Sequence, residues 1–116
     1  MKQFRAVSIT TDGVATVHDW DVTHGTLKHL QEAVGGLVDV VALARDMDMW
    51  VNDEGLVIGL PINEAATAIA HQHGTRHQFY VGTAVFTGGC NEEGDTLPLT
   101  EEQADRLTRL CAAATT

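Results

Sequence analysis

The beginning of the chain contains two short runs in which apolar and polar positions alternate. In residues 4–10, Phe4 and Ala6 fall on one side while Val7 and Ile9 fall on the other. Residues 14–20 form a second run rich in β-formers, and the short sequence between them ends in Asp-Gly. Alternation with a period of two is typical of strands, and a short Asp-Gly connection favours a tight turn. We therefore expect a β-hairpin.

The next segment changes to a helical period. Leu27, Leu30 and Val34 recur at steps of three and four residues, which places them on one face of a helix. A hydroxyl from Thr23 or Thr26 is expected to cap its start, and the glycines at 35 and 36 to end it. Residues 37–44 are rich in Val and Leu, which predicts a largely buried strand whose exception is Asp39.

The middle of the chain predicts a second hairpin and a second helix. Residues 47–52 and 56–59 are the expected strands, and the Asp-Glu-Gly sequence between them is the expected turn. Asn63 is a good N-cap for a helix from Glu64 to about His73, and Gly74 is expected to close it.

The last third predicts one strand, one loop and one helix. Residues 79–86 have a strand pattern, and 88–96 are polar and glycine-rich. Thr100 and Gln103 fit a capping box before an apolar helical face that ends near Cys111, and residues 112–116 are expected to fray. Without regular βαβ alternation, this order predicts one α+β domain over residues 1–116, with five to six antiparallel or mixed strands and three packed helices.

Composition narrows the class of protein. The chain has 116 residues and a formal net charge of −9, and its seven Lys and Arg residues are scattered. Direct nucleic-acid binding is disfavoured because phosphate backbones repel such a surface. No apolar run approaches a membrane span and the start does not resemble a signal peptide, so we expect no membrane association and a cytoplasmic location with Cys90 and Cys111 as free thiols. The acidity suits a basic protein partner or simply solubility.

Candidate chemistry is sparse. His71, His73 and His77 are the densest metal-ligand group, but a two-residue step points helical side chains apart, and Gly74 interrupts the second step. Cys90 is the better nucleophile candidate because it lies in a glycine-rich loop, whereas Ser8 lacks a nucleophile elbow. We therefore predict no catalytic residues, no metal and no cofactor.

Several stretches resemble a known family. Residues 30–41 read LQEAVGGLVDVV, 50–56 read WVNDEGL and 59–63 read GLPIN, followed by VGTAV at 81–85 and EGDT at 93–96. Together they are similar to the signature of the domain of unknown function 3846 family. The resemblance implies a small protein of bacteriophages, prophages, plasmids or actinobacterial genomes, with no established activity and no catalytic residues to carry over.

Three functions remain open at this level. The leading hypothesis is a non-enzymatic accessory protein of phage or mobile-element origin that acts by contact with a host or viral protein, and a homodimer is an open alternative. The second is a binder of a nucleotide-like metabolite. The third is an enzyme that uses Cys90 or a histidine-bound metal. A ligand pocket would be lined by Asn52, Asp53, Gly55, Gly59, Asn63, Asp95 and Thr96.

Overall fold

The computed structural model describes residues 2–74 and 78–115. Within these residues one antiparallel sheet has five strands in the order β2-β1-β5-β4-β3, and three helices pack on it. This confirms the predicted α+β class. The elements are β1 (Gln3–Ile9), β2 (Ala15–Asp21), α1 (Leu27–Val34), β3 (Val38–Ala44), β4 (Met47–Asn52), α2 (Glu64–Gln72), β5 (Ala84–Thr87) and α3 (Glu101–Ala114).

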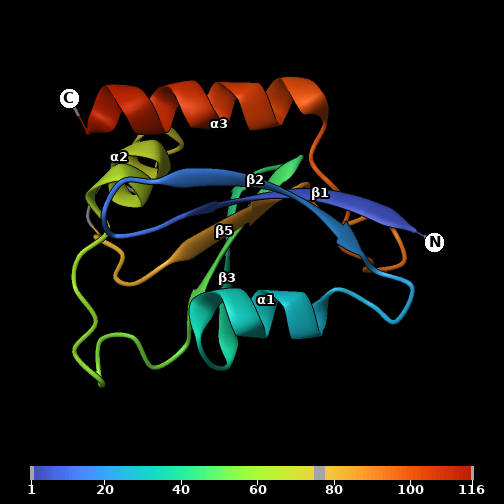
Figure 1. Cartoon of the computed structure of the whole chain (residues 1–116), viewed down its shortest axis with the longest axis horizontal. Coiled ribbons are helices and arrows are strands. Elements are labelled where there is room, and N and C mark those ends of the chain that lie inside the picture. Colours follow the sequence, from blue (N-terminus) through green and yellow to red (C-terminus); the bar gives the residue numbers. More distant parts are fainter. Residues whose placement is uncertain (1, 75–77, 116) are drawn as a thin grey trace.

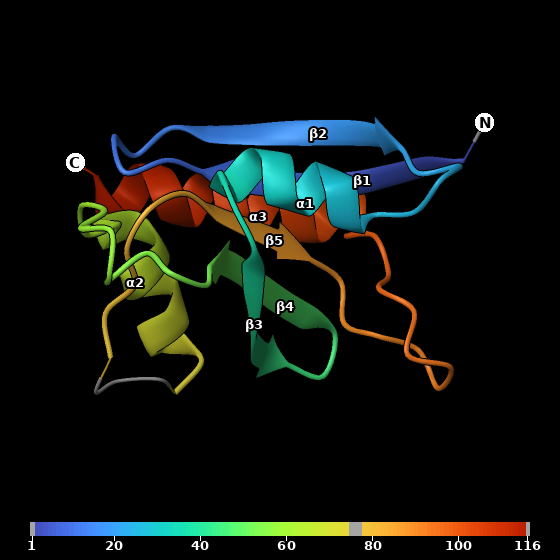
Figure 2. The same ribbon diagram turned by 90° about the horizontal axis from the view of Figure 1, so that it is seen from below.

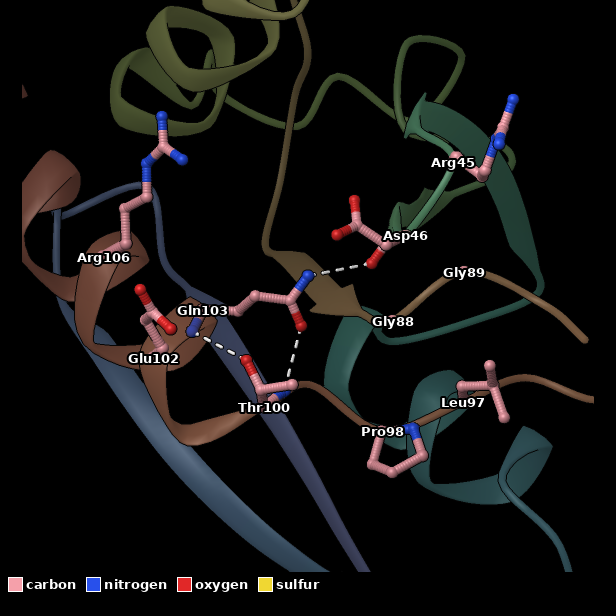
Figure 3. Close-up of a pocket in the computed structure, with 10 residues that line it drawn as sticks. All are labelled: Arg45, Asp46, Gly88, Gly89, Leu97, Pro98, Thr100, Glu102, Gln103 and Arg106. Carbon is pink, nitrogen blue, oxygen red and sulfur yellow. Dashed lines mark hydrogen bonds between the residues drawn. The ribbon is translucent and has the colours of Figure 1, made fainter.

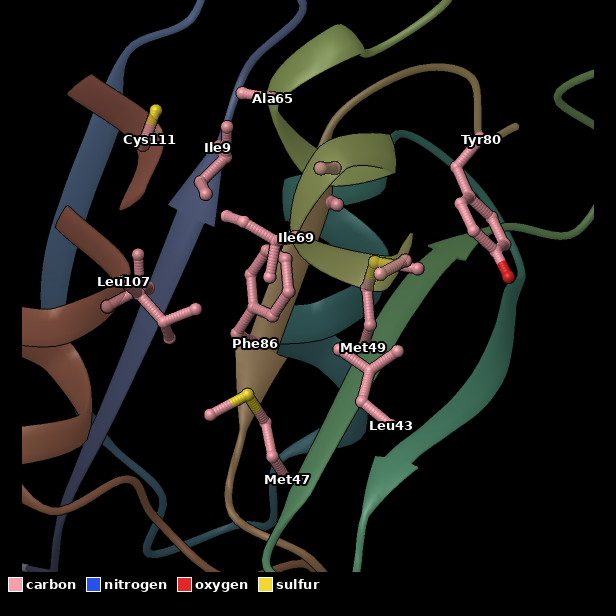
Figure 4. Packing of buried hydrophobic residues seen from close by; sticks show 14 of the residues in the cluster. Ile9, Leu43, Met47, Met49, Ala65, Ile69, Tyr80, Phe86, Leu107 and Cys111 are labelled. Atoms are coloured by element: carbon pink, nitrogen blue, oxygen red, sulfur yellow. The ribbon is translucent and has the colours of Figure 1, made fainter. Parts of the chain in front are cut away.

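The helices lie on both faces of the sheet. Figure 1 shows α1 on one side and α2 with α3 on the other, and Figure 2 shows the sheet from the α1 side. Successive side chains of a strand point to opposite faces, so each central strand serves two apolar layers. Phe86 of β5 packs with Ile69 of α2 and Leu107 of α3 (Figure 4). Its neighbour Val85 packs on the other face with Leu30 of α1.

The predicted first hairpin is confirmed. β1 and β2 pair antiparallel in a register that sets Val7 opposite Val17. Gly13 in the turn has a φ of 79°, a backbone conformation that favours glycine. A side chain there would also collide with Thr115 at the end of α3, so the hairpin turn and the last helix meet closely.

Helix α1 begins and ends where the sequence indicates, but its capping prediction was wrong. Thr26 occupies the N-cap without a side-chain hydrogen bond, and the Thr23 hydroxyl donates instead to Asp21. Thr26 has a helical backbone conformation, unlike the extended one from which N-cap side chains typically reach the free N–H groups. Gly35 ends the helix in the left-handed conformation, as predicted.

Strand β3 corrects the expectation of a largely buried strand. It is the last strand of the sheet, and only Leu43 among its residues is buried. A strand with one neighbour and partial helix cover leaves most of its side chains in solvent, whatever its Val and Leu content. Its partner is β4, so the hairpin here is β3–β4.

The expected hairpin between residues 47–52 and 56–59 is therefore wrong. Residues 56–59 form consecutive turns, in which the Ile58 N–H donates to the Glu54 carbonyl and the Leu60 N–H to the Gly55 carbonyl. These local bonds replace a strand ladder. β4 pairs with β5 on its other side.

The second half keeps its predicted caps but shifts its boundaries. The strand expected at 79–86 is limited to Ala84–Thr87, preceded by an isolated bridge between Val81 and Ile62. Thr100 and Gln103 form the predicted capping box. α3 continues to Ala114, past the expected fraying point at 112, while position 116 of that expected tail lies outside the described residues. No described helix is long and apolar enough to cross a membrane.

Candidate functional site

The seven residues predicted to line one ligand pocket are not gathered in one place. Asn52, Asp53 and Gly55 line a pocket of about 240 Å³ beside β3 and β4. Asp95 and Thr96 line another of about 310 Å³, beside the start of β1. Phe86 of β5 pairs with Met49 of β4 on one side and with Val7 of β1 on the other, so β1 and β4 run in the same direction. The end of β4 and the start of β1, and with them the two cavities, therefore lie toward opposite ends of the sheet.

Two of the predicted residues use their side chains to hold the backbone. The buried Asn52 amide donates to the Val34 carbonyl (3.1 Å) and accepts from the Glu54 N–H (2.8 Å), which ties the end of α1 to the loop after β4. Asn63 is fully buried and accepts from the Ala66 N–H (3.0 Å) as the N-cap of α2.

The Asn63 amide nitrogen also donates to the carbonyls of Ile9 (2.8 Å) and Gly82 (2.9 Å). One side chain thus joins β1, the start of α2 and the segment before β5. Its donors and its acceptor are engaged with the backbone, so Asn63 shapes the fold.

Two of the predicted glycines, Gly55 and Gly59, shape the loop between β4 and α2. A Cβ at Gly55 would lie 2.7 Å from a methyl group of Val81, so the loop packs closely against that residue. Gly59 has a φ of 75°, which closes the turn at an exposed position.

Exposed apolar side chains gather around the pocket beside β3 and β4. Val57 is 86% exposed, Leu56 69% and Phe79 52%, and all three line the 240 Å³ pocket. Ile58 and Ile62 continue the loop and are also more than half exposed. Large contiguous apolar surface on a folded protein marks an interaction site.

Acidic groups surround these side chains. Asp39 and Asp53 line the same pocket, and Glu54 adjoins them in the loop. From position 46 to 74 the sequence contains no Lys or Arg but carries Asp46, Asp48, Asp53, Glu54 and Glu64. We call the combination the acidic apolar surface: Asp39, Asp53, Leu56, Val57 and Phe79 around the pocket.

The β3 edge borders this surface. The Asp53 N–H donates to the Leu37 carbonyl (2.8 Å), which continues the β3–β4 ladder by one residue. Because hydrogen-bonding residues alternate along an antiparallel pair, the backbone groups of Val38 and Val40 point away from β4. The Val40 N–H is bonded by the Asp39 carboxylate (3.0 Å).

A larger cleft lies at the start of α3. It has a volume of about 550 Å³, and its walls include the backbone of Gly88 and Gly89. Arg45 and Arg106 flank it (Figure 3), and within residues 2–74 and 78–115 neither guanidinium makes a hydrogen bond or ion pair. Asp46 and Glu102 also line the cleft and balance its charge.

The metal and thiol candidates are distributed over the fold. His71 pairs with the Gln78 carbonyl (2.8 Å) and His73 with the Ile69 carbonyl (2.9 Å), while His77 lies outside the described residues. In the part of the chain that the structure describes, no three His, Cys, Asp or Glu side chains are grouped as metal ligands. Both cysteines are free; Cys90 is exposed, whereas burial raises the pKa of the Cys111 thiol.

Sequence reasoning missed the exposed aliphatic loop and an aromatic stack. The run 56–58 has a strand composition, which predicts a hairpin strand where the structure has turns. The Trp20 ring stacks with the rings of His18 and His29, at centroid distances of 5.3 Å and 5.0 Å. The His18 ring is also hydrogen-bonded to the Ser8 hydroxyl at 2.8 Å. The Trp20–His29 and His18–Ser8 contacts join different secondary-structure elements, and local patterns carry no signal for them.

Comparison with known proteins adds a family. No curated protein and no solved structure matches the chain. A family model described as a domain of unknown function (DUF3846) matches residues 2–112, which is nearly the whole chain. The matched range includes the motifs around the Gly-Gly helix end and the Asn-Asp-Glu-Gly turn. The chain therefore belongs to the DUF3846 family.

Proposed function

We propose that this protein is a non-enzymatic accessory protein, of phage or mobile-element origin, that binds another protein through the acidic apolar surface. The observation that carries the proposal is the exposure of Leu56, Val57 and Phe79 around one pocket. Burying a Val, Leu or Phe side chain stabilises a contact by about 1.5–3 kcal/mol. Three such residues therefore supply a useful anchoring area.

Charge selects the kind of partner. Asp39, Asp53 and Glu54 border the apolar side chains, and the surrounding stretch lacks Lys and Arg. Complementary charge speeds association and excludes wrong partners. A protein segment with both basic and apolar side chains fits this surface, whereas a second copy of the chain would bring like charges together.

The pocket volume favours a side chain over a metabolite. Small-molecule sites usually measure about 300–1,000 Å³. The pocket beside β4 measures about 240 Å³, so it accommodates an anchoring side chain better than a nucleotide.

A site-specific crosslinking experiment tests the proposal. A photo-reactive amino acid replaces Val57 in one protein and Val17 in a control, because Val17 is an exposed valine on β2, at the other end of the strand order. We expect a host or viral protein to be captured from the source cell only from position 57. The captured protein is then purified and its affinity measured directly.

Substitution completes the test. Val57→Asp should weaken binding of the purified partner by at least about tenfold, corresponding to about 1.4 kcal/mol. Val17→Asp should change it by less than about twofold. Equal effects of the two substitutions would reject the acidic apolar surface as the binding site.

The cleft at α3 favours a second candidate function. Its 550 Å³ lies within the range of small-molecule sites, and Arg45 and Arg106 would suit an anionic, nucleotide-like ligand. In a thermal-shift screen against nucleotides, a ligand at a hundredfold its Kd should stabilise the protein by about 2.7 kcal/mol. The shift should disappear in Arg106→Ala, and no shift with any nucleotide would reject this candidate.

A further inference from the structure

The outer edge of the sheet beside the acidic apolar surface offers main-chain groups to a partner. β3 is the terminal strand, and Val38 and Val40 direct their backbone groups away from β4. Such an edge is a template on which an extended segment of another protein can add as a further strand.

One of these outward groups is covered. The Asp39 carboxylate accepts the hydrogen bond of the Val40 N–H at 3.0 Å. The β3–β4 register also shifts between Ala42 and Ala44, which interrupts the ladder near the other end of β3. Bulges and charged side chains at an edge are known protections against unselective strand pairing.

Asp39 belongs both to the edge of β3 and to the lining of the 240 Å³ pocket. It lines the pocket together with Val41, which lies two residues along the same strand and therefore on the same face. A strand added to β3 would thus present alternate side chains to Asp39 and to the pocket. The residue that closes the edge is the one that a basic side chain would engage.

We propose that the partner segment adds to β3 as a β-strand, and that a Lys or Arg of that segment draws the Asp39 carboxylate away from the Val40 N–H. This inference rests on the proposed function and names its binding mode. The segment then has a basic and an apolar side chain two residues apart, one opposite Asp39 and one in the 240 Å³ pocket. Asp39 makes the exchange selective, because a neutral or acidic strand leaves the Val40 N–H occupied.

A set of synthetic peptides tests this mode. The probe is a nine-residue peptide in which threonine alternates with lysine and valine, so that one face of the extended peptide carries both. A second peptide has glutamine in place of lysine, and a third has N-methyl groups on its threonines, which removes backbone donors but keeps charge and apolar area. Binding to the full-length protein is measured by fluorescence anisotropy at physiological ionic strength.

The inference predicts that the lysine peptide binds at least about tenfold more tightly than either of the others. In Asp39→Ala, which frees the Val40 N–H, the preference for lysine over glutamine should fall to within about twofold. Asp39→Asn retains an acceptor for that N–H and removes the charge, so it should bind both peptides weakly. Asp53→Asn is the matched control, because it removes a charge from the same pocket without touching a strand N–H, and it should keep most of the preference.

The outcomes separate this inference from the proposed function. Equal binding of the N-methylated and unmodified lysine peptides would overturn strand addition while leaving the surface as a binding site. Failure of every peptide to bind wild type, with the crosslinked partner still sensitive to Val57→Asp, would overturn only the binding mode. If Asp39→Ala dimerises in analytical ultracentrifugation and Asp39→Asn does not, the protective role of the carboxylate is supported; a wild-type dimer through β3 would contradict it.

Discussion

Replacement of Asn63 by alanine tests whether the prominent polar residues of this chain shape its backbone. The Asn63 side chain makes three hydrogen bonds in a fully buried position: to the Ala66 N–H, the Ile9 carbonyl and the Gly82 carbonyl. Loss of an N-cap costs about 1 kcal/mol. Each buried carbonyl left without this donor costs about 1 kcal/mol or more. The expected loss of unfolding free energy is therefore about 3 kcal/mol, a large share of the roughly 5–15 kcal/mol of a typical domain.

The assay is urea unfolding followed by far-ultraviolet circular dichroism, with Asn91→Ala as the control. Asn91 also accepts backbone hydrogen bonds, from Glu93 (3.0 Å) and Asp95 (2.9 Å), but these lie in solvent. Its replacement should cost less than about 1 kcal/mol, because water replaces the lost partner.

Asn63→Asp separates the two roles of the amide. It keeps the cap acceptor but places a carboxylate against two carbonyl oxygens, so it should be at least as destabilising as the alanine variant. A loss below about 1 kcal/mol in Asn63→Ala, or equal losses at positions 63 and 91, would refute the reasoning and reopen Asn63 as a ligand-binding residue.

Three further predictions concern stability. Gly89→Ala should cost at least about 2 kcal/mol in the same unfolding assay, because its Cβ would overlap the backbone carbonyl of Arg45; a loss near zero would contradict that close approach. Burial lowers the pKa of His18 below its ordinary 6.5, so below pH 6.5 the unfolded chain binds a proton more readily than the folded protein does. The free energy of unfolding should therefore be independent of His18 above pH 6.5 and fall as the pH drops below that value. His18→Gln should flatten this slope. Burial raises the pKa of Asp48, so its ionised form opposes folding as the pH rises above 3.8. Asp48→Asn should therefore raise the Tm at pH 7 and not at pH 3. A lower Tm of this variant at pH 7 would contradict the prediction and show that the carboxylate has a stabilising partner.

Local signals in the sequence predicted much of the fold. The Asp-Gly turn, the Asn63 cap and the Thr100 capping box depend on contacts within a few residues, and each is found in the structure. The burial of β3 depends instead on strand order, and a Val-rich run fits a central or an edge strand equally well. Its position at the edge could not be read from its composition.

The structure places the Asn-Asp-Glu-Gly turn at the end of β4, beside the 240 Å³ pocket, and ligand binding by its residues stays a prediction. Asn63 was recognised as a cap, but its bond to Ile9, 54 positions away, is set by the packing of α2 on the sheet. The absence of Lys and Arg from 46 to 74 was visible in the sequence, and the structure adds that exposed aliphatic side chains share that stretch.

The most direct test of the account is a map of amide proton and nitrogen chemical shifts of the labelled protein as the crosslinked partner is added. The account predicts that the largest changes fall at residues 37–41, at residues 53–58 and at Phe79, and that they are absent in Val57→Asp. Changes confined to the cleft of Arg45 and Arg106, with the 53–58 loop unmoved, would contradict the claim that the acidic apolar surface binds the partner.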